Sequence, residues 1–201
     1  MSAKVSKFIS ILFHPVLIPT LGFLLLFNSG FYFSMLTWEA KRFVLLVVLL
    51  STGILPIISV AILSLNPKFD ISMQRSQDRI IPLLSSAVFY YLGSVLLGRM
   101  RAFPVFKIFL IASILVIVIV LLISFKWKIS NHMAAVGGMT GTLFALSFRT
   151  GVNPVWSLLF VVLVSGVVGT ARLVLGKHDL KQIVAGYAVG FLMLYSVIYF
   201  I

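Results

Sequence analysis

Residues 108–125 read IFLIASILVIVIVLLISF, a run of 18 residues without a charged side chain. An α-helix needs about 20 predominantly apolar residues to cross the hydrocarbon core of a bilayer, with about 17 to 25 as the usual range. A run of this length and composition predicts a membrane-spanning helix. The chain is therefore expected to be a membrane protein.

Similar runs recur along the whole chain of 201 residues, of which 61% are hydrophobic and only 10% are charged. Soluble domains usually carry about a quarter charged residues. We therefore expect one domain, residues 1–201, built as an all-α polytopic membrane bundle of about six to seven transmembrane helices. The predicted spans are Phe8–Phe27, Phe43–Leu65, Ile80–Gly98, Ile108–Phe125, His132–Phe148, Val155–Ala171 and Ile183–Ile201.

The first predicted span combines features of a leader peptide and of a broken helix. Lys4 and Lys7 precede its apolar run, as in a signal peptide, but the uncharged stretch continues far beyond it without a small-residue cleavage site, which favours a mature span. Its His14-Pro15 pair and Pro19 predict a kink or a re-entrant segment. We interpret His14 as a packing or hinge residue beside Pro15.

The charge balance of the chain restricts its expected partners. The formal net charge is +12, but it is spread over short loops rather than gathered on one soluble face. This pattern argues against nucleic acid and favours the anionic headgroups of the bilayer. Cysteine is absent, and the three histidines and four acidic residues show no ligand-type clustering, so neither a cofactor nor a metal is expected. The sequence names no protein partner.

Three polar connections are predicted to lie on one side of the membrane. Two crossings separate the connection Asn66–Arg79 from Lys126–Asn131, and two more separate the latter from Arg172–Gln182. Because an even number of crossings returns a chain to the same side, the three connections can converge on one site. Arg99 and Arg101 fall on the opposite side, where we expect loop anchors.

Two of these connections carry a histidine beside residues that bind phosphate in many proteins. One connection ends with Ser130-Asn131-His132, and the other holds Arg172 and His178. Phosphoryl transfer needs positive charge around the phosphate oxygens, a nucleophile in line with the scissile bond, and an acid for the leaving oxygen. Arginine can supply the positive charge, histidine can serve as the nucleophile or the acid, and a serine hydroxyl can donate a hydrogen bond to the phosphate.

These segments resemble the motifs of the type 2 phosphatidic acid phosphatase superfamily of membrane lipid phosphatases. That family carries Lys-x6-Arg-Pro, then Pro-Ser-Gly-His, then Ser-Arg-x5-His-x3-Asp. The spacing Arg172-x5-His178-x3-Gln182 matches the third motif, with glutamine in place of aspartate. Ser130-Asn131-His132 stands where the second motif has Ser-Gly-His.

The candidate first motif is Lys68-x6-Arg75, which is followed by Ser76 rather than proline. Arg79, with Pro82 three residues further on, is a rival for the arginine of this motif. The family usually places its first two motifs close together, whereas residues 80–125 intervene here.

The resemblance implies a metal-independent reaction in which His178 attacks phosphorus to form a phosphohistidine and His132 protonates the leaving group. Gln182 lies four residues after His178, so on a helix it shares the same face and can orient the imidazole without adding negative charge. The expected phosphate ligands are Arg172, Ser130, Arg75, Lys68 and Arg79.

Structural roles remain open for several of these residues. Serine and asparagine are favoured at helix N-caps, so Ser130 and Asn131 can serve as caps for the following span. Arg172, Lys177 and Lys181 also fit interfacial anchors, and for the two lysines this is the preferred interpretation.

Glycines indicate how the spans pack. Gly137-x3-Gly141 and Gly186-x3-Gly190 are small-residue spacings that allow helices to approach closely. Gln182, Gly186 and Gly190 fall four residues apart and form one stripe. We expect this stripe to pack the last span against the span after His132, which would bring the two histidine segments together.

The sequence thus predicts a membrane lipid phosphatase for a lipid phosphate or pyrophosphate, such as undecaprenyl pyrophosphate, phosphatidylglycerophosphate or phosphatidic acid. The alternative is a pseudophosphatase that binds lipid or acts as a structural subunit of a membrane complex, and Gln182 and Ser76 favour it. A small transporter is disfavoured because no acidic residue lies within a span.

The orientation of the site is left undecided by charge. The side with the motifs carries 10 of the 16 Lys and Arg residues, but only 7 against 6 without Lys68, Arg75 and Arg172. The resemblance implies a bacterial inner membrane with the site on its outer face.

Overall fold

The computed structural model describes residues 1–66, 79–100 and 103–201. These residues form helices joined by short connections, with no strand among them, which confirms the predicted all-α class. The helices are α1 (Ala3–Leu12), α2 (Ile18–Phe27), α3 (Trp38–Val48), α4 (Leu55–Leu63), α5 (Ile80–Leu97), α6 (Pro104–Ser124), α7 (Asn131–Thr150), α8 (Val155–Val174) and α9 (Leu180–Phe200). A short 3₁₀ turn, Tyr32–Met35, precedes α3, and a π-helical segment, Leu49–Ile54, joins α3 to α4.

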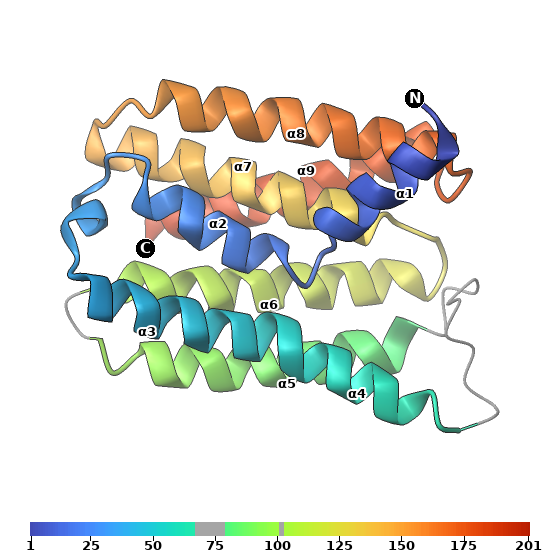
Figure 1. Cartoon of the computed structure of the whole chain (residues 1–201), viewed down its shortest axis with the longest axis horizontal. Helices are drawn as coiled ribbons and strands as arrows, with labels where there is room; N and C mark the ends of the chain where they lie inside the picture. The colour runs from blue at the N-terminus through green and yellow to red at the C-terminus, as the bar shows by residue number, and fades with distance from the viewer. Residues whose placement is uncertain (67–78, 101–102) are drawn as a thin grey trace.

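The helices lie side by side along the long axis of the molecule (Figure 1). The N-terminus, the connection from α6 to α7 and the connection from α8 to α9 lie at one end, together with the start of α5. The C-terminus and the connection from α7 to α8 lie at the other end. The ends of the polar connections therefore gather on one side, as the count of crossings predicts.

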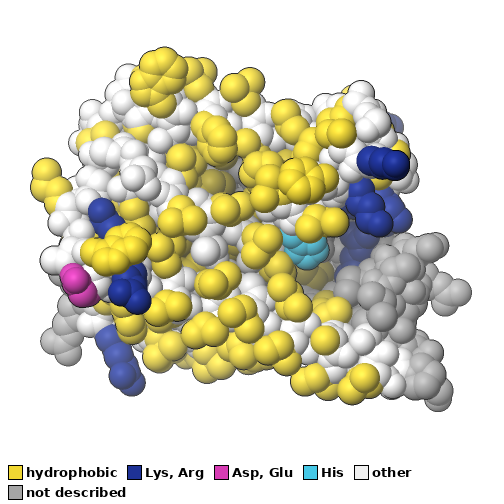
Figure 2. Space-filling view, viewed as in Figure 1, with side chains coloured by type: hydrophobic (Ala, Val, Ile, Leu, Met, Phe, Trp, Pro, Cys, Tyr) yellow, Lys and Arg dark blue, Asp and Glu magenta, His cyan; other side chains and the backbone are white. Residues whose placement is uncertain are grey.

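Among the residues that the structure describes, five stretches are long and apolar enough to cross a membrane, which identifies an integral membrane protein. They are Trp38–Leu63, Ile80–Leu97, Pro104–Ser124, Val155–Val174 and Leu180–Phe200. The 20-residue helix α7 runs beside them but is not one of the five. Its hydropathy is lower because it begins with Asn131 and His132 and contains several threonine, glycine and serine residues. Figure 2 shows apolar side chains between two end groups of Lys and Arg, as expected for a protein embedded in a bilayer.

The first predicted span is broken, as its prolines suggest. Instead of one helix over 8–27, the chain forms α1, which ends at Leu12, and α2, which begins at Ile18. Pro15 has no N–H with which to continue the hydrogen-bond ladder of α1. The carbonyl of His14 accepts hydrogen bonds from the N–H groups of Leu17 at 2.8 Å and Ile18 at 3.2 Å, so the break is closed onto the first turn of α2.

Helices α7 and α9 make the closest contact in the bundle, and glycine permits it. A Cβ built at Gly137 would meet the carbonyl oxygen of Tyr187, and one built at Gly190 would meet that of Ala134. One built at Gly186 would lie 2.6 Å from the carbonyl oxygen of Ser130. The backbones are thus in direct contact, and the predicted glycine stripe is confirmed as the surface that joins the last span to the span beginning at His132.

We expect Gly190→Ala to lower the free energy of unfolding by about 1–3 kcal/mol, because the added methyl group overpacks a contact between two backbones. Gly166→Ala on α8 is the matched control, since a Cβ at Gly166 meets nothing within 4 Å. Thermal unfolding in detergent measures both variants. Equal melting temperatures for the two variants and the wild type would contradict the proposed role of the α7–α9 contact.

Candidate active site

A cavity of about 540 Å³ opens between the helices at the end where the polar connections meet. Five separate parts of the chain bring histidine, arginine and asparagine side chains to its lining: His14, Arg79, Asn131, His132, Arg172 and His178. Most of its remaining lining is apolar and includes Ile18, Pro19, Val60, Phe109, Val116 and Val120. The cavity therefore has one cationic, histidine-bearing end and a longer apolar part.

His178 is held by the first turn of α9. Gly176, with φ of +59°, lets the chain reverse after α8, and Asp179 caps α9 by accepting a hydrogen bond from the N–H of Gln182 at 2.8 Å. His178 is buried, and its Nδ1 lies 2.9 Å from Oε1 of Gln182. An amide oxygen only accepts, so Nδ1 carries the proton and donates it, which leaves the lone pair of Nε2 available.

His132 is the second residue of α7, and its position follows from the α7 N-cap. Ser130 Oγ accepts from the N–H of Met133 at 3.5 Å, and the Ser130 N–H donates to the carbonyl of Gln182 at 3.3 Å. The ring of His132 donates from Nε2 to the carbonyl oxygen of Ser10 at 3.1 Å. Since a carbonyl cannot donate, Nδ1 is the nitrogen of neutral His132 that remains unprotonated.

Of the described arginines, Arg79 and Arg172 line the cavity. Arg172 lies in the last turn of α8, and its buried Nε has no hydrogen-bond partner among the residues that the structure describes. Nη1 of Arg79 donates to the carbonyl of Ile129 at 3.3 Å, which ties the start of α5 to the connection before α7. Of the two candidates for the first-motif arginine, Arg79 is placed at the site, whereas Lys68, Arg75 and Ser76 lie outside the described residues.

Ser130, which the sequence predicts to be a phosphate ligand, does not line the cavity, whereas its neighbour Asn131 does. Ser130 is fully buried as the N-cap of α7 and is not among the residues that line the cavity. Asn131 does line it, and its buried Oδ1 has no hydrogen-bond partner in the described part of the chain. The capping interpretation thus describes Ser130, and Asn131 is the polar side chain presented to the cavity.

The electrostatics of this end favour a bound anion. Burial, followed by the charges of Arg172, Arg79 and Lys128, lowers the pKa of His178 to about 4, against the opposing effect of its hydrogen bond to Gln182. Burial also lowers the pKa of Lys128, and the nearby charges of Arg79, Lys177 and Arg172 lower it further. Several positive groups thus repel one another here, and a phosphate placed among them would relieve that repulsion.

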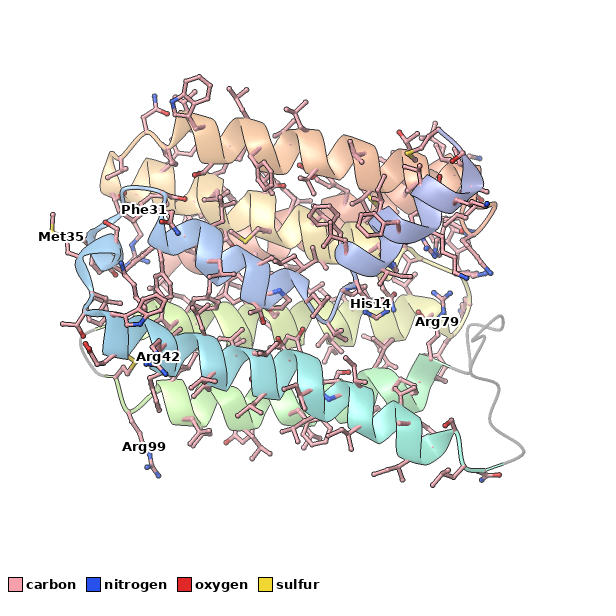
Figure 3. The ribbon with its side chains drawn as sticks, viewed as in Figure 1. His14, Phe31, Met35, Arg42, Arg79 and Arg99 are labelled. Carbon is pink, nitrogen blue, oxygen red and sulfur yellow. The ribbon has the colours of Figure 1, made fainter. Side chains whose placement is uncertain are left out.

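His14 is the site residue that the sequence interpretation missed. Its side chain is exposed in the cavity, and its ring centroid lies 5.4 Å from that of His132 in an edge-to-face arrangement. Figure 3 places His14 and Arg79 toward the same end of the bundle, far from Arg42 and Arg99. The sequence signal at this position is the His-Pro pair at the break of an otherwise apolar run, which predicts a packing or hinge residue.

Fold and cavity together describe an integral membrane protein with a cavity lined by histidine and arginine. The family model described as PAP2 superfamily matches residues 119–201, which is consistent with a PAP2 superfamily member and confirms the resemblance seen in the motifs. The matched region contains His132, Arg172, His178 and Gln182, whereas His14 and Arg79 precede it. No curated protein and no solved structure matched the chain.

We expect His178 to titrate near pH 4 rather than near 6.5 in buffer without phosphate, because its lowered pKa keeps the ring neutral at higher pH. Nitrogen NMR of histidine-labelled protein in detergent, with His178→Gln to assign the signal, measures this. Replacing Arg172 by Leu should raise the midpoint, since it removes a positive neighbour. A His178 midpoint at or above 6.5 in the wild type would show that the ring is not buried among cations.

Proposed function

We propose that the protein is a membrane lipid phosphatase that uses His178 as its nucleophile. The PAP2 superfamily match supports phosphatase activity on a phosphorylated substrate. The observation that carries the finer proposal is the cavity itself. Three histidines and two arginines line it, and most of its remaining lining is apolar.

In this proposal the phosphate binds at the cationic end. Arg172 Nε, which has no hydrogen-bond partner among the described residues, donates to the phosphate oxygens, and Arg79 and Lys128 contribute positive charge from the neighbouring connections. The first helical N–H groups of α7 add donors directed at an anion. Lys68 and Arg75 remain candidate ligands from the sequence alone.

The first chemical step transfers the phosphoryl group to His178. Nε2 forms a bond to phosphorus while the bond from phosphorus to the leaving oxygen breaks, and the electron pair stays with that oxygen. The hydrogen bond from Nδ1 to Gln182 holds the ring in the tautomer that this attack needs. His132, protonated at Nδ1 beside the bound phosphate dianion, gives its proton to the leaving oxygen.

The second step releases phosphate. A water molecule attacks phosphorus, the bond to Nε2 breaks, and Nδ1 of His132 takes a proton from the attacking water, which restores both histidines. The hydrogen bond from His132 Nε2 to the Ser10 carbonyl restricts proton exchange to Nδ1 in both steps. In this proposal, protein side chains carry out both steps.

The apolar part of the cavity supports a lipid as the carrier of the phosphate. Its lining includes residues from α2, α4 and α6, all of which lie within the apolar band of the molecule. A hydrocarbon chain in this part would be shielded from water while the headgroup reaches His178. Undecaprenyl pyrophosphate, phosphatidylglycerophosphate and phosphatidic acid fit this description, and a bacterial inner membrane is the proposed location.

The proposal predicts metal-independent phosphate release by purified protein in detergent from at least one of these three lipids. His178→Ala should lower this release at least 10³-fold, because the nucleophile is gone. Lys181→Ala, which removes an exposed side chain from the same segment, is the matched control and should stay within about twofold of the wild type.

Equal release by wild type and His178→Ala would exclude His178 as the nucleophile. If correctly folded wild type releases no phosphate from any of the lipids, the lipid-binding pseudophosphatase becomes the better description. The observation that favours that second candidate is Gln182, which orients His178 without the negative charge that would stabilise its cation.

We further expect Gln182→Asp to raise kcat about tenfold or more, because a carboxylate stabilises the developing positive charge on His178. In a serine protease triad, the exchange of aspartate for its amide lowers turnover about 10⁴-fold. Gln182→Leu should instead lower kcat, since no acceptor remains for Nδ1. Phosphate release at saturating substrate measures both, and an increase in Gln182→Leu would contradict the orienting role of Gln182.

A further inference from the structure

His14 lies outside the region matched by the PAP2 superfamily model and outside the three motifs, yet it lines the cavity beside the ring of His132. The break between α1 and α2 places it there. Its backbone carbonyl is held by the N–H groups of Leu17 and Ile18, and Pro15 prevents the helix from continuing through it. The N-terminal segment therefore forms one fixed wall of the site.

This wall contacts His132 twice. The Ser10 carbonyl accepts from His132 Nε2 at 3.1 Å, and the ring of His14 meets the ring of His132 edge to face with centroids 5.4 Å apart and planes at 79°. Two imidazole rings in this contact can each direct a nitrogen toward one oxygen atom placed beside the pair. In the proposed reaction, this oxygen is the leaving-group oxygen, to which His132 delivers its proton.

The surroundings of His14 favour a ligand-contacting role over a packing role. Its side chain is exposed in the cavity, whereas a histidine that fills the core would be buried. Figure 2 shows a histidine side chain open to the surface among apolar groups and near one of the two groups of Lys and Arg. An imidazole in this place can offer an N–H to an anionic oxygen.

We infer that His14 is a further substrate-contacting residue, which donates a hydrogen bond to the leaving-group oxygen of the phosphate ester beside His132. This inference rests on the proposed function. No proton is transferred by His14: the bond from phosphorus to oxygen breaks, the electron pair stays on the oxygen, and His132 supplies the proton. His14 stabilises the negative charge that develops on that oxygen before the proton arrives.

The test uses two esters with the same tail and different leaving groups, decyl phosphate and 4-decylphenyl phosphate. An alkoxide develops far more negative charge than a phenolate, so it depends more on a donor at the leaving oxygen. We expect His14→Ala to lower kcat/KM about 100-fold for the alkyl ester and less than about fivefold for the aryl ester. His14→Gln, which keeps an N–H donor, should recover part of the loss for the alkyl ester.

Two controls separate this inference from the proposed function and from a structural role. Asn28→Ala alters the far end of α2, where Asn28 Nδ2 donates to the Leu24 carbonyl, and should leave the ratio of the two kcat/KM values unchanged. His178→Ala should abolish turnover of both esters. If His178→Ala or the absence of wild-type turnover disproves the phosphatase proposal, the role of His14 falls with it.

If instead the phosphatase proposal holds, the ratio alone decides the role of His14. Losses of equal size for the two esters in His14→Ala would identify a hinge or packing residue and overturn the inference. So would an unchanged kcat/KM for the alkyl ester. A selective loss for the alkyl ester, with partial recovery in His14→Gln, supports contact with the leaving oxygen.

Discussion

In the contact between α7 and α9, backbone meets backbone because glycine removes the side chains that would hold the helices apart. Gly137 and Gly141 on α7 face carbonyls of α9, and Gly186 and Gly190 on α9 face carbonyls of α7. Inside a bilayer, packing of this kind replaces the hydrophobic drive that joins helices in water. It also aligns the starts of the two helices, where the Ser130 N–H donates to the Gln182 carbonyl. His132 and the His178–Gln182 pair therefore belong to one end of the bundle.

Positive charge gathers around this aligned pair from three further places. Arg172 comes from the end of α8, Arg79 from the start of α5, and Lys128 from the connection before α7. In the described part of the chain, Gln182 supplies a neutral oxygen to His178, and the carboxylate of Asp179 caps α9. In the proposed reaction, an anionic substrate would stabilise a cation formed on His178.

The N-terminal segment closes the site from the opposite side. Because α1 and α2 are separated at His14-Pro15, the Ser10 carbonyl and the His14 ring can both approach His132. In an unbroken helix, Ser10 and His14 would lie one turn apart. The Ser10 carbonyl would then accept the hydrogen bond of the helix from the N–H of His14 and would not be free for His132. The break therefore brings the N-terminal segment to the cavity, where residues far from His132 in the chain contact its ring.

The sequence by itself determined the membrane class, the common side of the polar connections and the pairing of His178 with Gln182. Each follows from a local property: the length of apolar runs, the parity of crossings and the four-residue turn of a helix. Only the tertiary structure decided that His14 and Arg79 join the site, that Asn131 lines the cavity and that Ser130 is a buried cap. Whether a side chain lines the cavity depends on which helix faces pack together and on how deeply the residue is buried. Packing between residues distant in sequence determines both properties.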